Sequence, residues 1–394
     1  MQIQGNEKYI VFGAGKCAFG MNKYLSQFYD ILGFYDSNIS LWGKTFCGKT
    51  IFNKSQVIEL CRKYQDHLYF IVSPIQAGVV AEITEIIKIE FKGRVIDKDV
   101  LQNDMMKRKH EENVNSIGEY HVDFAQQSVQ WTEELVSEVK YWVNRVAKEN
   151  STYHEEYITN INNSDVKPAK GYHGENIFNY LRQGAILMDI GCGAVSRYGS
   201  LLPDGGRVSL IAVDSLAHAY KKINDHYAPE NKKAVTFGMF EFIAVFFKKD
   251  FADVILIENA LDHCVDPLKS VIECLQVLKP GGLLRLYHHR AEAIWEGCLG
   301  LHKWNIDYND NNEFIVWNEN NYINIKKFFG DDVEVKVFVQ GGEQRSSQYI
   351  TVELVKKETY DYLNYINLTE ENEQLGRCIN SMMLYMAENC YCYL

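Results

Sequence analysis

The sequence predicts an α/β protein in which two parallel sheets follow one another along the chain. Two observations predict this class: short apolar runs alternate with stretches of helical periodicity, and a glycine-rich turn follows the first apolar run in each half. The chain is also long, at 394 residues, and a single hydrophobic core rarely extends over that length. We therefore expect two α/β domains in tandem, because strands that alternate with helices assemble into parallel sheets.

The first domain is expected over residues 1–105. Its strands are short and apolar, and they are predicted at residues 8–12, 31–35, 68–72 and 94–96. Residues 106–130 are polar and contain the charged run KRKHEE, which is typical of a linker or a solvated helix. Because linkers make few contacts, we expect a protease to cut the chain first between about residues 103 and 130.

The second domain is expected over residues 131–356 and begins with a helix from Trp131. Seven strands are predicted in it, at residues 186–190, 210–213, 234–237, 254–257, 283–287, 333–339 and 349–355. The last two strands are joined by a short Gly-Gly segment and should therefore pair antiparallel. Residues 357–394 have a helical pattern and are expected either to cap a domain or to join a second copy of the chain in a homo-oligomer.

The composition argues against several functions. The net charge of −11 disfavours general nucleic-acid binding, because such binding relies on Lys and Arg at phosphates. No apolar run is long enough to span a membrane and no leader segment is recognisable, so a cytoplasmic protein is expected. The ten cysteines are scattered without a C-x-x-C pair, which favours reduced thiols. No spacing of His, Cys or acidic residues matches a metal motif, so no metal ion is predicted, and a divalent-metal site formed by histidines with Asp262, Asp266 and Glu292 is the alternative.

The glycine turn of the second half carries the strongest functional signal. The segment ILMDIGCG places Asp189 in a predicted strand, followed by Gly191, Cys192 and Gly193 in the turn. Glycine allows the backbone to approach a ligand closely and to adopt positive φ. Asp214 follows 21 residues after Gly193, at the end of the next strand. A carboxylate in that position can accept hydrogen bonds from both hydroxyls of a ribose.

This region resembles the class I S-adenosylmethionine-dependent methyltransferases. DIGCG is similar to their cofactor loop, Asp214 to their ribose-binding acid, and VLKPGG (277–282) to the turn before their fifth strand. The resemblance implies two tandem Rossmann-like domains, the second a seven-stranded sheet with a reversed last strand, and S-adenosylmethionine as the cofactor. Phe240 and Glu241, just after the third strand of this domain, are expected to flank the adenine ring, and a core position is the alternative for Phe240. The implied cofactor contacts are Asp189, Gly191, Cys192, Gly193, Asp214, Ser215, Phe240, Glu241 and Asn259.

Two further motifs narrow the resemblance. ENALDHCVDP (258–267) and GLHKWNID (300–307) are similar to motifs of a bacterial subgroup often associated with surface-glycan pathways. The resemblance implies a hydroxyl of a sugar, a nucleotide-sugar or a glycan-linked molecule as the methyl acceptor. The subgroup usually has an acidic-Asn-Glu-Ala-Glu stretch where this chain has HHRAE (288–292), so only Glu292 carries over as an acceptor contact. Trp304 is expected to form an apolar wall against a sugar face.

A hydroxyl acceptor requires a base that takes its proton. Histidine suits this role because its ordinary pKa lies near neutral pH. The candidates are His263, His289 and His302, and His302 is preferred because Trp304 is close to it in the sequence. His288 is the alternative to His289, since adjacent residues of a strand point to opposite faces. For each histidine, a hydrogen-bonding or packing role is the competing interpretation.

The turn of the first domain has a dinucleotide-type layout. Gly13 and Gly15 follow the first strand, Gly20 comes five residues later, and Asp36 ends the second strand. The segment resembles small Rossmann-like domains attached to nucleotide-sugar-modifying enzymes. It spans roughly half of a full dinucleotide fold, and a mononucleotide or nucleotide-sugar ligand is therefore expected rather than hydride transfer. A scaffold without a ligand is the alternative.

Three other functions stay open: methylation of another small metabolite, nucleotide binding or assembly without catalysis, and NAD-dependent oxidation. An intact glycine turn with its acid, together with a histidine-rich segment, favours catalysis over binding alone. Oxidation would need the first domain to hold the reactive cofactor, and the sequence shows no matching substrate domain.

Overall fold

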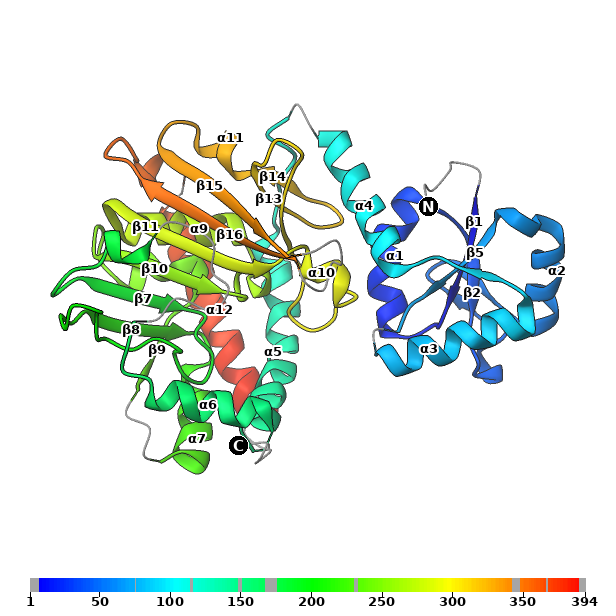
Figure 1. The fold of residues 1–394 in the computed structure, drawn as a ribbon, viewed down its shortest axis with the longest axis horizontal. Coiled ribbons are helices and arrows are strands. Elements are labelled where there is room, and N and C mark those ends of the chain that lie inside the picture. Colours follow the sequence, from blue (N-terminus) through cyan, green and yellow to red (C-terminus); the bar gives the residue numbers. More distant parts are fainter. Residues whose placement is uncertain are drawn as a thin grey trace. The chain divides into compact units, whose positions relative to one another are not determined.

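Each of the two units contains one main sheet, as a computed structural model shows (Figure 1). The structure describes residues 7–74, 76–113, 116–147, 151–166, 176–229, 233–341, 348–365 and 368–389. Unit 1 consists of Met1–Ser116, Ala291–His302 and Asn318–Asn320. Unit 2 consists of Ile117–Arg290, Lys303–Trp317 and Asn321–Leu394. The predicted α/β class is confirmed for both units.

The sheet of unit 1 has six strands in the order β3-β4-β2-β1-β5-β6. They are β1 (Lys8–Phe12), β2 (Asp30–Tyr35), β3 (Thr45–Phe46), β4 (Lys49–Phe52), β5 (Leu68–Val72) and β6 (Arg94–Val95). All neighbours are parallel except the hairpin β3–β4. The four predicted strands are confirmed. The hairpin was not predicted because its strands have only two and four residues.

The helices of unit 1 among the described residues are α1 (Lys16–Phe28), α2 (Lys54–Tyr64), α3 (Ala77–Ile86), α4 (Lys98–Asn113) and the short α10 (Glu292–Trp295). α1 contacts β2, α2 and α3 contact β5, and α4 contacts α1. Ile10 of β1 and Phe70 of β5 are fully buried in the core of the unit. The strand order changes direction between β1 and β5, and in open α/β sheets ligands bind at the carboxyl ends of the strands beside such a point.

The main sheet of unit 2 has seven strands in the order β15-β16-β11-β10-β7-β8-β9. They are β7 (Ile186–Ile190), β8 (Ser209–Asp214), β9 (Val235–Phe237), β10 (Ala252–Glu258), β11 (Leu278–His289), β15 (Val333–Gln340) and β16 (Tyr349–Lys356). β16 is antiparallel to both β11 and β15, while the other neighbours are parallel. The seven predicted strands and the reversed last strand are confirmed.

The remaining elements of unit 2 are seven helices and a small antiparallel sheet among the residues that the structure describes. The helices are α5 (Phe124–Ala147), α6 (Thr152–Asn162), α7 (Ala217–Tyr227), α8 (Ile243–Phe246), α9 (Pro267–Val277), α11 (Ile325–Phe329) and α12 (Leu368–Asn389). The sheet consists of β12 (Asn305–Tyr308), β13 (Phe314–Trp317) and β14 (Tyr322–Asn324). This sheet was not predicted. α12 lies in the predicted helical tail, and its Leu375 packs in one cluster with Phe124 of α5. Among the described helices, none combines the length and hydropathy needed to cross a bilayer.

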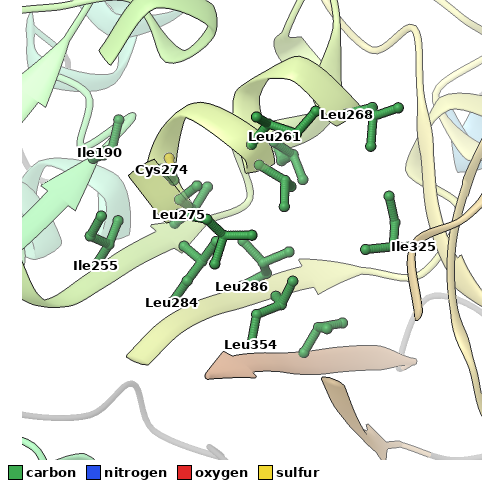
Figure 2. Packing of buried hydrophobic residues seen from close by; sticks show 14 of the residues in the cluster. Ile190, Ile255, Leu261, Leu268, Cys274, Leu275, Leu284, Leu286, Ile325 and Leu354 are labelled. Atoms are coloured by element: carbon green, nitrogen blue, oxygen red, sulfur yellow. The ribbon is translucent and has the colours of Figure 1, made fainter. Parts of the chain in front are cut away.

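Figure 2 shows the core on one face of the main sheet of unit 2, where Leu275 of α9 points toward Leu284 and Leu286 of β11. These side chains are fully buried. Burial of each aliphatic side chain of this size stabilises the fold by roughly 1.5–3 kcal/mol. Because side chains alternate along a strand, His288 follows Leu284 and Leu286 onto this face, whereas His289 points to the opposite face.

The chain divides differently from the expected linker at residues 106–130. Helix α4 runs across the expected boundary at residue 105. Beyond it, the Ile117 and Glu119 carbonyls accept the N–H groups of Asn324 and Tyr322, both at 2.8 Å. Residues 117–119 are therefore held by unit 2, and these hydrogen bonds argue against rapid proteolysis at that point.

Unit 1 also includes a segment that the sequence assigned to the second domain. In residues 291–302, the Trp295 carbonyl accepts from Lys98 Nζ at 2.9 Å, and the Ile294 carbonyl accepts from Gln102 Nε2 at 3.3 Å. A Cβ on Gly20 of α1 would lie 2.0 Å from the Gly297 carbonyl oxygen. The expected role of Gly20 as part of a ligand loop is therefore corrected: this glycine permits close packing between α1 and the segment.

Candidate functional site

The turn after β7 requires both of its glycines. Gly191 has φ +74° and Gly193 has φ +66°, in the region that disfavours other residues. A Cβ on Gly191 would lie 2.6 Å from Ala260 Cβ and 2.7 Å from Phe240 Cζ. Cys192 lies between the two glycines, and its N–H donates to the Val213 carbonyl at 3.3 Å. The turn is thus packed between the ends of β8 and β10.

Asp214, at the end of β8, fixes this turn. Its Oδ2 accepts the N–H of Gly193 at 3.0 Å and its Oδ1 accepts the N–H of Leu216 at 2.8 Å. Burial raises the pKa of Asp214 to about 6. Each carboxylate oxygen has a second lone pair, so hydrogen bonds from ribose hydroxyls stay chemically available. Ser215, the next residue, is half-buried.

Asp189 holds the other side of the turn. Its side chain is buried, and its Oδ2 accepts a hydrogen bond of 2.6 Å from the Ser196 hydroxyl. Burial raises the pKa of Asp189 to about 7. The carboxyl group therefore joins the end of β7 to Ser196, seven residues farther along the chain.

Trp142 of α5 covers the turn, a contact that was not predicted. A Cβ on Gly193 would lie 2.1 Å from Trp142 Cζ2. The indole N–H of Trp142 donates to Glu138 Oε1 at 2.8 Å, and its ring meets that of Tyr220 edge-on at a centroid distance of 5.7 Å. The single signal in the sequence was an aromatic residue on a predicted amphipathic helix, which is usually a core position.

Phe240 and Glu241 separate in the structure, although they were expected to flank the adenine together. Phe240 is half-buried beside Gly191. Glu241 is buried, and its Oε1 accepts the N–H groups of Val265 at 2.6 Å and Asp266 at 3.3 Å. Burial raises the pKa of Glu241 to about 7. Glu241 thus stabilises the turn after β10, which differs from its expected position at the cofactor.

Asn259 connects the carboxyl ends of β10 and β11. Its N–H donates to the Tyr287 carbonyl at 2.8 Å, and its Oδ1 accepts the N–H of His289 at 3.1 Å. Its φ of +47° is rare for a residue with a side chain. Since Ala260 is the next residue and contacts Gly191, the expected cofactor loop and the end of β11 lie close together.

Asp262 lies between two of the histidines. Its Oδ2 is 3.6 Å from His263 Nε2, and its Oδ1 is 3.9 Å from His288 Nδ1. Asp262 and His288 are fully buried, whereas the His263 side chain is 20% exposed. Burial lowers the pKa of His288 to about 4, although Asp262 opposes this shift. His288 is therefore neutral near pH 7, and His263 is the histidine of this group that solvent reaches.

His289 and His302 have different surroundings. The His289 ring packs on Tyr349, with centroids 4.1 Å apart. His302 is the last residue of the 291–302 segment of unit 1, and its N–H donates to the Leu299 carbonyl at 3.2 Å. The next residue, Lys303, belongs to unit 2 and donates its N–H to the Asp262 carbonyl at 3.3 Å.

The expected acceptor contact of Trp304 differs from the structure, whereas that of Glu292 stays a prediction. Trp304 is 1% exposed, stacks on Tyr120 at 5.6 Å, and donates its indole N–H to the Cys264 carbonyl at 3.2 Å. It is a core residue and offers no wall to an acceptor. Glu292 begins α10 in unit 1.

A chain of ion pairs that the sequence did not reveal lies near the turn. Arg197 Nη1 is 2.5 Å from Glu258 Oε2 at the end of β10, and Arg197 Nη2 is 3.4 Å from Glu156 of α6. Glu156 also pairs with Arg145 of α5 at 2.6 Å. Partial burial of such pairs makes them stronger than exposed ones. They fix α5, which carries Trp142, to the carboxyl edge of the sheet.

In unit 1, three of the four expected ligand residues come together. Asp36 Oδ2 accepts the N–H of Ala14 at 2.8 Å, and the Gly13 N–H donates to the Tyr35 carbonyl at 2.7 Å. A Cβ on Gly15, at the start of α1, would meet no heavy atom within 4 Å. Gly13, Gly15 and Asp36 therefore share the carboxyl end of β1 and β2.

One family model matches part of unit 2. Residues 188–286 match the family model described as "Methyltransferase domain". No curated protein matches the chain. Among solved structures, the chain is similar to a SAM-dependent methyltransferase from Methanosarcina mazei, with 17% identity, 49% of this chain and 100% of that chain covered, and a TM-score of 0.31.

Two other solved structures have comparable similarity. One is a SAM-dependent methyltransferase from Aquifex aeolicus, with 17% identity, 45% of this chain and 87% of that chain covered, and a TM-score of 0.29. The other is the CurJ carbon methyltransferase, with 14% identity, 88% and 82% of the two chains covered, and a TM-score of 0.36.

The matched residues include the glycine turn, Asp214, the carboxyl end of β10 and the first nine residues of β11. With the strand order of the main sheet, it defines the class of protein: the chain is an S-adenosylmethionine-dependent methyltransferase with a class I fold. S-adenosylmethionine is its cofactor. Within this class, the methyl acceptor distinguishes one enzyme from another.

Proposed function

We propose that this methyltransferase transfers a methyl group to a hydroxyl of a sugar, a nucleotide-sugar or a glycan-linked molecule. The observation that carries the proposal is the pairing of His263 with Asp262 after β10, on the edge of the sheet that also bears the glycine turn. The similarity of residues 258–267 and 300–307 to glycan-associated methyltransferases supports the sugar acceptor.

The residues present fit S-adenosylmethionine. Gly191 leaves no room for a Cβ between Ala260 and Phe240, so the turn is shaped for close approach, and Asp214 provides a carboxylate at the end of β8. We assign the ribose to Asp214 and the adenine to the side of Phe240, with Ser215 and Asn259 near them. When bound, the cofactor supplies an electrophilic methyl group. Positioning of the acceptor against it accounts for much of the expected rate.

His263 is the base that this geometry favours. A hydroxyl attacks the methyl group efficiently only if its proton is removed, and a nearby imidazole can accept that proton. Asp262 Oδ2 lies 3.6 Å from His263 Nε2, and the His263 side chain is 20% exposed, so this imidazole is the one of the group that an acceptor in solvent can reach. His289 and His302 stay candidates for acceptor contact, and Glu292 is carried over as an acceptor contact from the resemblance alone.

The test uses the intact chain. Isothermal titration calorimetry with S-adenosylmethionine and S-adenosylhomocysteine measures cofactor binding, and formation of S-adenosylhomocysteine during incubation with hexoses and nucleotide-sugars measures transfer. We expect both cofactors to bind and hydroxyl-bearing sugars to raise turnover. Absence of cofactor binding would refute the whole proposal. Cofactor binding with turnover only on amine or thiol acceptors would refute the hydroxyl acceptor and favour another small-metabolite methyltransferase.

A second function is proposed for unit 1, namely binding of a mononucleotide or a nucleotide-sugar at Gly13, Gly15 and Asp36. It is supported by the open space beside Gly15 and by the position of these residues at the carboxyl ends of β1 and β2. Calorimetry with UDP and UDP-glucose, in the parent and in Asp36→Ala, tests it. Equal heats in both proteins would instead favour a scaffold without a ligand.

Cytoplasmic location and assembly as a homo-oligomer belong to the same proposal. α12 packs on α5 within the chain through Leu375 and Cys378, and this supports a capping role for the tail. Light scattering on the purified protein determines whether a second copy also associates.

A further inference from the structure

We propose that Tyr287, His289 and Tyr349 form the platform on which the methyl acceptor lies, and that the acceptor is a hydroxyl-bearing ring with a flat apolar face. The inference rests on the proposed function, because it assigns the acceptor side of the same site. It replaces the sugar wall expected at Trp304, which the structure buries in the core.

The three rings stack at the carboxyl end of β11. The centroids of Tyr287 and Tyr349 are 5.3 Å apart with planes 5° from parallel, and those of His289 and Tyr349 are 4.1 Å apart at 38°. His289 and Tyr349 are direct partners across β11 and β16. Tyr287 precedes His289 by two residues and shares its face of the sheet. All three residues are half-buried, so each keeps part of its surface accessible.

Asn259 places this stack beside the cofactor loop. It bonds to the Tyr287 carbonyl at 2.8 Å and to the His289 N–H at 3.1 Å. The next residue, Ala260, contacts the Cβ position of Gly191 at 2.6 Å. A ring lying on the platform therefore has its hydroxyls within reach of the place where the glycine turn would hold the cofactor.

Polar groups border the rings on one side. Glu258 is the direct partner of Tyr287 across β10 and β11, so both side chains lie on the same face. Arg197 Nη1 donates to Glu258 Oε2 at 2.5 Å, and the Tyr198 hydroxyl also donates to Glu258. Aromatic surface with a few oriented polar groups is the usual composition of a site for a small polar ring. A pyranose and a phenol both have this chemistry.

Saturation-transfer NMR on the intact protein tests the platform without any turnover. The probes are methyl β-D-glucopyranoside, phenol and sorbitol, which carries hydroxyls but no ring. We expect saturation of the protons of at least one ring probe and none of sorbitol. Signal from the glucopyranoside assigns a sugar acceptor, and signal from phenol alone assigns an aromatic acceptor. Equal signals from all three probes, or none from either ring, would overturn the proposal.

Substitutions identify the residues. In the double variant Tyr287→Leu with Tyr349→Leu, the ring-probe signal should fall at least about fivefold, in line with the strength of aromatic stacking. The Phe variants at both positions keep the rings and should keep the signal, which guards against a Leu variant that folds poorly. Tyr227→Leu, on the exposed end of α7, is the matched control. Unchanged signal in the Leu variant would overturn the assignment.

Cofactor calorimetry on the same proteins separates this inference from the proposed function. S-adenosylmethionine should bind the parent and the Leu variant alike, because the platform belongs to the acceptor. Normal cofactor binding without ring-probe signal would refute the platform alone. If the parent protein itself does not bind S-adenosylmethionine, the proposed function is refuted.

Discussion

The Gly193 N–H donates to Asp214 Oδ2 at 3.0 Å, across 21 residues of sequence. The other carboxylate oxygen of Asp214 accepts the N–H of Leu216 at 2.8 Å, just before α7. One side chain thus joins the turn after β7 to the start of the helix after β8. Since the same carboxylate is the proposed ribose contact, the shape of the loop and the affinity for the cofactor depend on one residue.

Replacing Asp214 by Ala should weaken S-adenosylmethionine binding by about 1.5–3 kcal/mol, as expected for hydrogen bonds to a charged group. Calorimetry measures the change. Asp225→Ala is the control, because Asp225 pairs with Lys221 on the exposed side of α7 and both side chains are more than half exposed. Parent-like affinity in the Asp214 variant would remove the cofactor assignment.

Gly193 and Trp142 should be coupled in stability. Gly193→Ala introduces a Cβ 2.1 Å from Trp142 Cζ2 and a residue that disfavours φ +66°, so the free energy of unfolding should fall by about 2–4 kcal/mol. In a Trp142→Ala background the clash disappears, and the same change should cost about 1–2 kcal/mol, the backbone strain alone. Urea unfolding of the four proteins forms the double-mutant cycle. Additive losses would show that the ring and the turn are independent.

Asp189 should make stability depend on pH. Burial raises its pKa from an ordinary value of 3.8 to about 7. Because the pKa of Asp189 is higher in the folded protein than in the unfolded one, the protonated carboxyl favours the folded state. This contribution to the free energy of unfolding is complete below pH 3.8 and is lost as the pH rises through 7. Asp189→Asn cannot ionise and still accepts from Ser196. Relative to the parent, the variant should therefore gain about 2–4 kcal/mol between pH 4 and pH 8. Urea unfolding at both pH values measures the gain, and an equal difference at both would contradict the shift.

At least one of His263, His289 and His302 should contribute to turnover on a hydroxyl acceptor. Replacement of the base by Asn should lower turnover about 100- to 10,000-fold with little change in cofactor affinity. His263 is the first candidate for the base because the Asp262 carboxylate lies 3.6 Å from its Nε2. A packing histidine would instead lower the melting temperature and leave turnover of the folded protein intact. If all three Asn variants turn over the acceptor as fast as the parent protein, the base is another residue. Glu292 and Asp262 are then the next candidates for the base.

Gly20→Ala should destabilise unit 1. Its Cβ would lie 2.0 Å from the Gly297 carbonyl oxygen, which is backbone and cannot rotate away. Overpacking of this kind costs about 1–3 kcal/mol. Gly78→Ala in α3 is the matched control, since its Cβ meets nothing within 4 Å and Ala favours a helix by about 1 kcal/mol. Thermal unfolding of both variants measures the contrast, and equal stability would show that residues 291–302 do not pack on α1.

The strands of both main sheets and the reversed last pair were predictable from the sequence. Short, nearly continuous apolar runs with helical stretches between them are local patterns, and they depend on neighbouring residues alone. The glycine turn was recognisable for the same reason, because Gly191 and Gly193 stand at a strand end where positive φ is required. The hairpin β3–β4 and the sheet β12–β14 were missed because strands of two to four residues leave too short a pattern.

The sequence by itself determined the fold class, the order of the strands along the chain and the glycine turn of the proposed cofactor site. The tertiary structure decided which side chains reach that site. In the folded chain, the Glu241 carboxylate accepts the N–H of Val265 and Trp304 is buried against Tyr120. Trp142 packs against Gly193. It also placed residues 291–302 in unit 1. These contacts join segments far apart in the chain, and they depend on packing and burial that local periodicity does not encode.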